Sequence, residues 1–116
     1  MLIDTRSMGF TLTDAIRRHV ESRVEAALGP VARWTVSVTA RLEDVNADRG
    51  GVDKRCRLVA SLRRYGVVVA EATNADLYAA VDEAADRIRR SAVRTVRRHL
   101  PRERKHPQRP GALVLN

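Results

Sequence analysis

The spacing of hydrophobic residues divides the first hundred residues into alternating strand and helix patterns. A short extended run covers residues 2–7. In residues 12–28, apolar side chains then recur every three or four positions, which is typical of one buried helix face. Thr11 and Asp14 have capping-box spacing, with Asp where Glu or Gln is usual, and a Gly-Pro pair ends the pattern. We therefore expect a helix of about seventeen residues here.

Strict alternation of apolar and polar residues follows, which is the period of a half-buried strand. From Trp34 to Glu43 the even-numbered positions are apolar and the odd-numbered ones are polar. A second alternating strand places Cys56 and Leu58 inward, with arginines and a serine outward. A turn at Tyr65-Gly66 leads into a strand over residues 67–72, and we expect Gly66 alone to adopt the left-handed conformation.

The last strongly periodic segment predicts a second helix, capped by Asn74 or Asp76. We expect it to end near His99, because the prolines that begin at Pro101 should rule out further helix. Its inward stripe consists of Leu77, Val81, Ala84, Ala85, Ile88, Ala92 and Val96.

The element order is therefore β-α-β-β-β-α, which predicts an α+β fold. A right-handed β-α-β crossover makes the first two strands parallel, whereas the remaining neighbours are antiparallel. Both helices need the same apolar cover, so we expect a two-layer sandwich with two helices on one face of a four-stranded sheet. Residues 1–100 would form this domain, and residues 101–116 a basic, proline-rich tail that we expect to be disordered.

Composition limits the classes of function. A chain of 116 residues suits a single core. We find no signal peptide and no apolar run of membrane-spanning length, so we expect a cytoplasmic protein with no membrane partner. Cys56 is the only cysteine, which excludes an intrachain disulfide, and its place in a strand pattern predicts a core residue.

The positive charge of the chain is concentrated at one end. Residues 1–86 contain 12 basic and 13 acidic side chains, whereas residues 87–116 contain 10 basic side chains and only Glu103 as an acid. Arginine accounts for 20 of the 22 basic residues. Its planar guanidinium binds phosphate with two parallel hydrogen bonds, although a GC-rich genome would also favour arginine.

Five arginines of the last helix fall within an arc of about 100 degrees, opposite the apolar stripe. Such a row climbs about 15 Å of helix and could follow the phosphates of an RNA strand. We expect Glu83 and Asp86 to form i,i+4 ion pairs with the first two arginines, as on an ordinary solvated face. The other three have no acid four residues away, so we interpret the row as an RNA-binding surface. It consists of Arg87, Arg90, Arg94, Arg97 and Arg98.

Three arginines of the first helix are secondary candidates for RNA binding. Arg17, Arg18 and Arg23 have acidic residues within helical reach, which could neutralise them. If the two helices are neighbours, their solvent edges would form a positive groove sized for a nucleic-acid backbone. Arg17 is the strongest candidate for that groove.

Other chemistry is poorly supported. The chain has four aromatic residues, and we interpret Trp34 as core, so recognition of phosphate and shape is favoured over base reading. The three histidines are dispersed, with no nucleophile elbow and no glycine-rich phosphate loop. We expect no catalytic residues, no metal, no cofactor and no small-molecule substrate, and hence no enzyme.

Three stretches carry a family resemblance. Residues 73–82 read TNADLYAAVD, residues 11–24 read TLTDAIRRHVESRV, and residues 52–72 read VDKRCRLVASLRRYGVVVAEA. In this order and spacing they resemble the ribosome hibernation promoting factor and ribosome-associated translation inhibitor family, also called sigma-54 modulation proteins. The resemblance covers residues 1–100 and implies a factor that binds the rRNA of the small ribosomal subunit, blocks the mRNA and tRNA channel, and silences idle ribosomes under stress.

The resemblance also implies which residues bind rRNA, namely the basic positions of both helices named above. The short tail implies a short form without the dimerising domain of the long forms. Two alternatives stay open: a general double-stranded-RNA-binding module, and a protein-interaction regulator of transcription whose basic helix binds an acidic partner.

Overall fold

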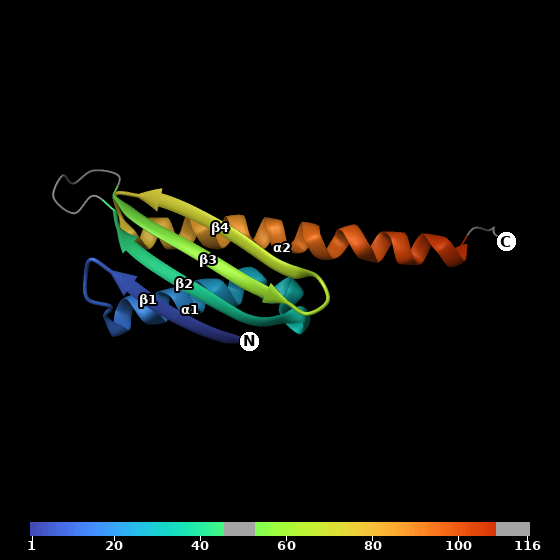
Figure 1. Ribbon diagram of the computed structural model, residues 1–116, viewed down its shortest axis with the longest axis horizontal. Helices are drawn as coiled ribbons and strands as arrows, with labels where there is room; N and C mark the ends of the chain where they lie inside the picture. The colour runs from blue at the N-terminus through green and yellow to red at the C-terminus, as the bar shows by residue number, and fades with distance from the viewer. Residues whose placement is uncertain (46–52, 109–116) are drawn as a thin grey trace.

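The computed structural model describes residues 1–45 and 53–108, with side chains through His99. Its elements follow the expected order β-α-β-β-β-α, with one additional short 3-10 helix after the first α-helix. Figure 1 shows their arrangement. They are β1 (Leu2–Met8), α1 (Asp14–Leu28), the 3-10 helix η1 (Gly29–Trp34), β2 (Thr35–Asp44), β3 (Lys54–Leu62), β4 (Gly66–Asn74) and α2 (Leu77–Gln108).

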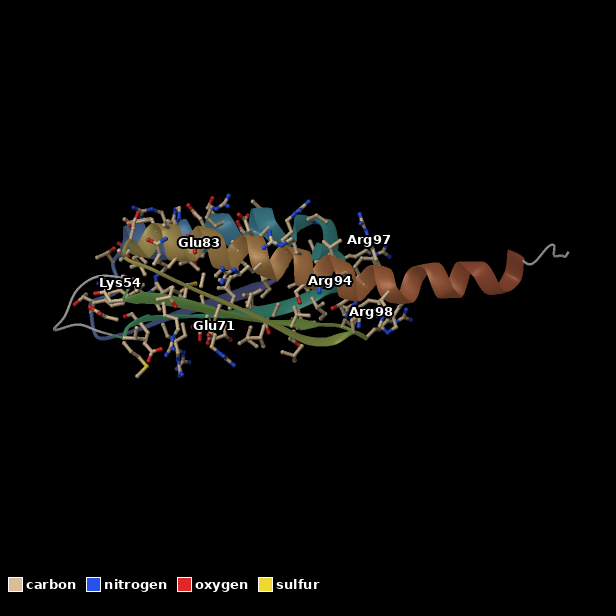
Figure 2. The ribbon with its side chains drawn as sticks, turned by 90° about the horizontal axis from the view of Figure 1, so that it is seen from above. Lys54, Glu71, Glu83, Arg94, Arg97 and Arg98 are labelled. Carbon is tan, nitrogen blue, oxygen red and sulfur yellow. The ribbon has the colours of Figure 1, made fainter. Side chains whose placement is uncertain are left out.

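The four strands form one sheet in the order β1-β2-β3-β4. β1 pairs with β2 in parallel, and the two following pairs are antiparallel. Both helices lie on the same side of this sheet, as Figure 2 shows. The α+β class and the two-layer arrangement are therefore confirmed.

The core lies between the sheet and the helices. Alternate residues of the strands point into it, including Leu42, Cys56 and Leu58, all with no exposed surface. From α2, Ile88 and Ala92 are equally buried. Burial of the Cys56 thiol raises its pKa to about 12, because the thiolate would lose its hydration in this apolar environment. The prediction that Cys56 belongs to the core is confirmed.

The α1 helix begins two residues later than the capping-box spacing suggested. Its N-cap is Thr13, whose hydroxyl accepts a hydrogen bond from the Ile16 N–H at 3.2 Å. The assignment of the cap to Thr11 is therefore wrong. Thr13 satisfies the N–H three residues onward, which is the usual geometry of a threonine cap.

The alternation predicted for β2 fails at its first residues. Thr35 is buried and Val36 is 47% exposed, the reverse of the expected faces. A register shift between Thr35 and Ser37 inverts the pattern, which returns to the expected phase from Val38 onward. The chain enters the strand from η1, and the Thr35 hydroxyl donates a hydrogen bond to the Val31 carbonyl at 3.0 Å. Trp34 thus ends η1 and is half-buried, so its assignment to the strand is wrong.

The turn between β3 and β4 contains two residues with positive φ. Gly66 has φ +88°, as expected, but Arg64 also has φ +79°. The expectation that Gly66 alone adopts this conformation is therefore wrong. A left-handed non-glycine residue costs about 1 kcal/mol. The Tyr65 N–H offsets part of this cost by donating to the Leu62 carbonyl at 3.2 Å.

The α2 helix has the expected beginning but extends past its expected end. Asp76 caps it, accepting a hydrogen bond from the Tyr78 N–H at 3.1 Å. Its backbone remains helical through Pro101 to Gln108, so the predicted end near His99 is wrong. A proline removes the hydrogen bond of its own nitrogen at a cost of about 3 kcal/mol, but the bonds of the neighbouring residues can continue the helix. The last part of the predicted tail, 109–116, lies outside the described residues.

Candidate nucleic-acid interface

The arginine row of α2 lies on the solvent side of the helix. Ile88, Ala92 and Val96 face the core, and all five predicted arginines are exposed. Figure 2 places Arg94 and Arg97, with the neighbouring Arg98, close together near the end of the sheet. The exposure of these five side chains agrees with their expected position away from the apolar stripe.

The ion pairs expected within α2 are not formed. Glu83 accepts a hydrogen bond from the Asn74 side chain at 2.9 Å, and Asp86 lies 3.7 Å from Arg23 of α1. Arg87 instead donates to the backbone carbonyl of Glu71 on β4, at 2.6 Å. The predicted Glu83 to Arg87 and Asp86 to Arg90 pairs are therefore wrong, because each acid is held by another element.

The other four predicted arginines of α2 lack acidic partners among the described side chains. Among the residues that the structure describes, no carboxylate lies within 4 Å of Arg90, Arg94, Arg97 or Arg98. Like charges at this density repel one another, which lowers the stability of the folded chain unless a polyanion is bound. The tertiary structure thus strengthens the distinction between this row and an ordinary solvated helix face.

All of the row except Arg87 lines a shallow hollow of about 760 Å³. Sequence reasoning missed one of its residues, Arg89, because Arg89 lies outside the arc opposite the apolar stripe. Its neighbours four residues away are Ala85 and Val93, so the same search for missing acids would have found it. The hollow is lined by Arg89, Arg90, Val93, Arg94, Arg97 and Arg98.

Arg23 of α1 is used within the fold. Its Nε donates to Asp82 at 3.0 Å, and the same Asp82 oxygen lies 2.8 Å from Nε2 of His19. Both groups lie on α1 and Asp82 lies on α2, so the cluster joins the two helices. The Tyr78 ring packs edge-on against the His19 ring, with their centroids 4.8 Å apart. Arg23 therefore helps to position α1 against α2, and part of its guanidinium is already paired within the fold.

Arg17 and Arg18 remain exposed on α1. Neither forms an ion pair among the described side chains. The space between the helices is not uniformly positive as expected, because the acidic Asp82 and Asp86 lie along the first part of the α1–α2 contact. The arginine-lined hollow begins only at Arg89, and Arg17 does not line it.

The opposite face of the sheet has a different electrostatic character. Arg57 pairs with Glu71 at 2.9 Å, and Arg6 pairs with Asp4 at 2.8 Å. These arginines are thus paired with acids on the same strand, as in β1, or on the neighbouring strand, as between β3 and β4. None of the four aromatic residues lies on a strand, so stacking of bases on the sheet is not supported.

Metal-binding and membrane-spanning features are absent from the described part of the chain. Among the described side chains, those of 1–45 and 53–99, no three His, Cys, Asp or Glu residues are grouped so that they could hold a metal ion. No helix in this part of the chain has both the length and the apolar character needed to cross a membrane.

Two solved structures have the same fold. The N-terminal domain of Protein Y from Thermus thermophilus is 28% identical and superposes with a TM-score of 0.66, covering 81% of this chain and 98% of that domain. A ribosomal subunit interface protein from Coxiella burnetii is 18% identical, with a TM-score of 0.68, and covers 78% of this chain and 92% of its own. The second likeness shows the fold alone.

A search of curated protein sequences found no match. A family model did match, over residues 3–100. This range takes in the four strands apart from Leu2, the α1 helix, and α2 past the end of the arginine row. The family is described as sigma 54 modulation protein and S30EA ribosomal protein. The chain belongs to this family.

Proposed function

We propose that this protein is a ribosome-associated factor that binds rRNA of the small ribosomal subunit through α2 and blocks the mRNA and tRNA channel. The observation that carries the proposal is the row of exposed arginines without acidic partners, Arg90 to Arg98. Membership of the family, whose description includes the S30EA ribosomal protein, supports the ribosome as partner.

The proposed mechanism is occupation of space, without chemistry. Guanidinium groups form charge-assisted hydrogen bonds to phosphate oxygens, and a rigid helix holds several of them at fixed spacing. Because the helix is already formed, binding does not have to order a flexible segment, and more of the contact energy contributes to affinity. A folded domain held in the decoding channel would exclude mRNA and tRNA sterically.

The two helices contribute unequally to the proposed surface. Arg94, Arg97 and Arg98 supply its centre, and Arg17 and Arg18 of α1 are secondary contacts. Arg23 is occupied by Asp82, so its contribution is to hold the helices together. Arg87 is partly occupied by the Glu71 carbonyl.

The decisive experiment reverses the charge at the centre of the row. A variant with Arg94, Arg97 and Arg98 all changed to Glu should fold, because the three side chains are exposed and unpaired. It should no longer pellet with small ribosomal subunits at low ionic strength, and it should no longer inhibit translation in a purified system. Retention of binding by the folded variant would refute the proposal.

A matched control carries the same change of charge on the open face of the sheet. Arg6, Arg41 and Arg57 line a separate hollow there with Asp4. Changing these three arginines to Glu alters the net charge of the protein as much as the α2 variant does. The control should keep most of its affinity for ribosomes, provided that circular dichroism shows a native fold.

A further inference from the structure

A second, smaller hollow lies where η1 meets α2. Its volume is about 190 Å³. Its walls are mainly apolar and come from both elements, with one guanidinium group among them. They are Pro30, Val31, Trp34, Val93, Val96 and Arg97.

This hollow adjoins the arginine-lined hollow of α2. Val93 and Arg97 line both of them. A chain of phosphates bound along α2 would therefore pass directly beside the smaller hollow. Because Arg97 lines both hollows, a phosphate that it contacts would lie at the boundary between them. The base of that nucleotide would then be within reach of the smaller, apolar hollow.

The indole of Trp34 forms the aromatic wall of the smaller hollow and is held in place by several contacts. The Tyr65 ring packs edge-on against it, with ring centroids 5.9 Å apart. Tyr65 in turn contacts the ring of His99 on α2 at 5.1 Å. The Trp34 carbonyl accepts a hydrogen bond from the Arg63 N–H at 2.6 Å. These contacts orient the ring before any ligand arrives.

Positive charge surrounds this aromatic group. The Arg33 guanidinium lies 4.9 Å from the centroid of the Trp34 indole, in cation–π geometry. Trp34 itself lines the hollow, whereas Arg33 is not among the lining residues. A ligand that enters the hollow would therefore contact an apolar aromatic wall and lie near the guanidinium groups of Arg33 and Arg97.

We propose that the Trp34 hollow receives one unpaired base of the RNA whose phosphates the α2 arginines bind. A nucleobase has a planar face that stacks on an aromatic ring, and it is attached to the phosphate chain that Arg97 would contact. An apolar side chain of a protein partner would fill the hollow but would not use these guanidinium groups. This inference rests on the proposed RNA binding and adds a base-contacting subsite to it.

The chain has a single tryptophan, so its intrinsic fluorescence reports on the proposed subsite. The experiment titrates the full chain with polyadenylate and, separately, with inorganic polyphosphate, which has phosphates but no bases. Binding of each polymer is followed independently by gel mobility. Both polymers should bind, and only polyadenylate should quench the Trp34 emission. Equal quenching by polyphosphate, or binding of polyadenylate without quenching, would overturn the inference.

Variants of Trp34 supply a second readout. Trp34→Leu should weaken binding of polyadenylate by about fivefold or more, at the lower end of what loss of one base–aromatic stack produces. Trp34→Phe keeps a ring that can stack and should lose less. Neither change should alter the affinity for polyphosphate. The matched control is Tyr78→Leu, an aromatic change near the beginning of α2, which should leave both affinities unchanged.

The outcomes separate this inference from the proposed function. If Trp34→Leu binds polyadenylate as tightly as the unchanged protein while charge reversal in α2 abolishes ribosome binding, only the base subsite is refuted. If the unchanged protein fails to bind ribosomes, the proposed function is refuted whatever the fluorescence shows. Because the quenching experiment uses the unchanged chain, it remains decisive even if the Leu variant does not fold.

Discussion

Replacing Arg94, Arg97 and Arg98 with Gln tests the phosphate contacts quantitatively. Five arginines line the α2 hollow. If each neutralises one phosphate, the logarithm of the association constant should fall against the logarithm of the salt concentration with a slope of about −3.5 to −4.5. The Gln variant leaves two of these arginines, and its slope should be about −1.4 to −1.8.

The assay is pelleting of small ribosomal subunits with the protein over a range of KCl concentrations. Gln removes charge without introducing repulsion, so the change in slope counts the lost contacts. The same three-residue change at Arg6, Arg41 and Arg57 on the open sheet face should leave the slope unchanged. A flat salt response of the unchanged protein, or equal slopes for it and the α2 variant, would refute the reasoning.

Four further predictions concern the stability of the fold and the burial of Cys56. Asp82→Asn removes the negative charge of the carboxylate that contacts His19 and Arg23, and because these groups are partly exposed it should lower the free energy of unfolding by only about 1 kcal/mol, measured by urea denaturation. Ile88→Ala creates a cavity beneath the arginine row and should cost about 2–5 kcal/mol in the same measurement. Cys56 has a pKa raised by burial to about 12, so a thiol reagent at about pH 8 should label it only after unfolding. The buried Cys56 thiol contributes fully to the free energy of unfolding below pH 9.0, the pKa of the thiol in the unfolded chain. This contribution is lost as the pH rises toward 12, which a series of urea midpoints would show.

The two alternative functions make different predictions. A general double-stranded-RNA-binding module should bind naked duplex RNA as tightly as it binds ribosomes, which a competition experiment measures. A regulator that binds an acidic protein should recover its partner from an extract treated with nuclease. Recovery that depends on intact RNA, together with weak binding to naked duplex, is the result expected for the proposed ribosome-associated factor.

The sequence alone determined the order of the elements and most of the inward faces. Hydrophobic periodicity is a local property of the chain, and a residue such as Leu58 or Ile88 is buried wherever its strand or helix packs. The parallel pairing of β1 with β2 followed from the handedness of crossovers. The arginine arc of α2 was equally visible, because it depends only on helical geometry.

The tertiary structure alone decided which charges are free. Helical spacing suggested partners for Arg87 and Arg90 within α2, but Asp86 contacts Arg23 of α1 and Arg87 contacts the Glu71 carbonyl of β4. Such partners are distant in sequence, so no local spacing rule could identify them. The link that Arg23 makes between the two helices was hidden from the sequence for the same reason.

Backbone irregularities were also decided by the folded structure. Strict alternation placed Trp34 in a strand, but η1 and the register shift at Thr35 move its ring to the junction with α2. The hydrophobic pattern of one strand cannot show a β-bulge, because a bulge is defined by how that strand pairs with its neighbour. The position of Trp34 beside Arg97 therefore depends on the packing of η1 against α2, which only the three-dimensional structure determines.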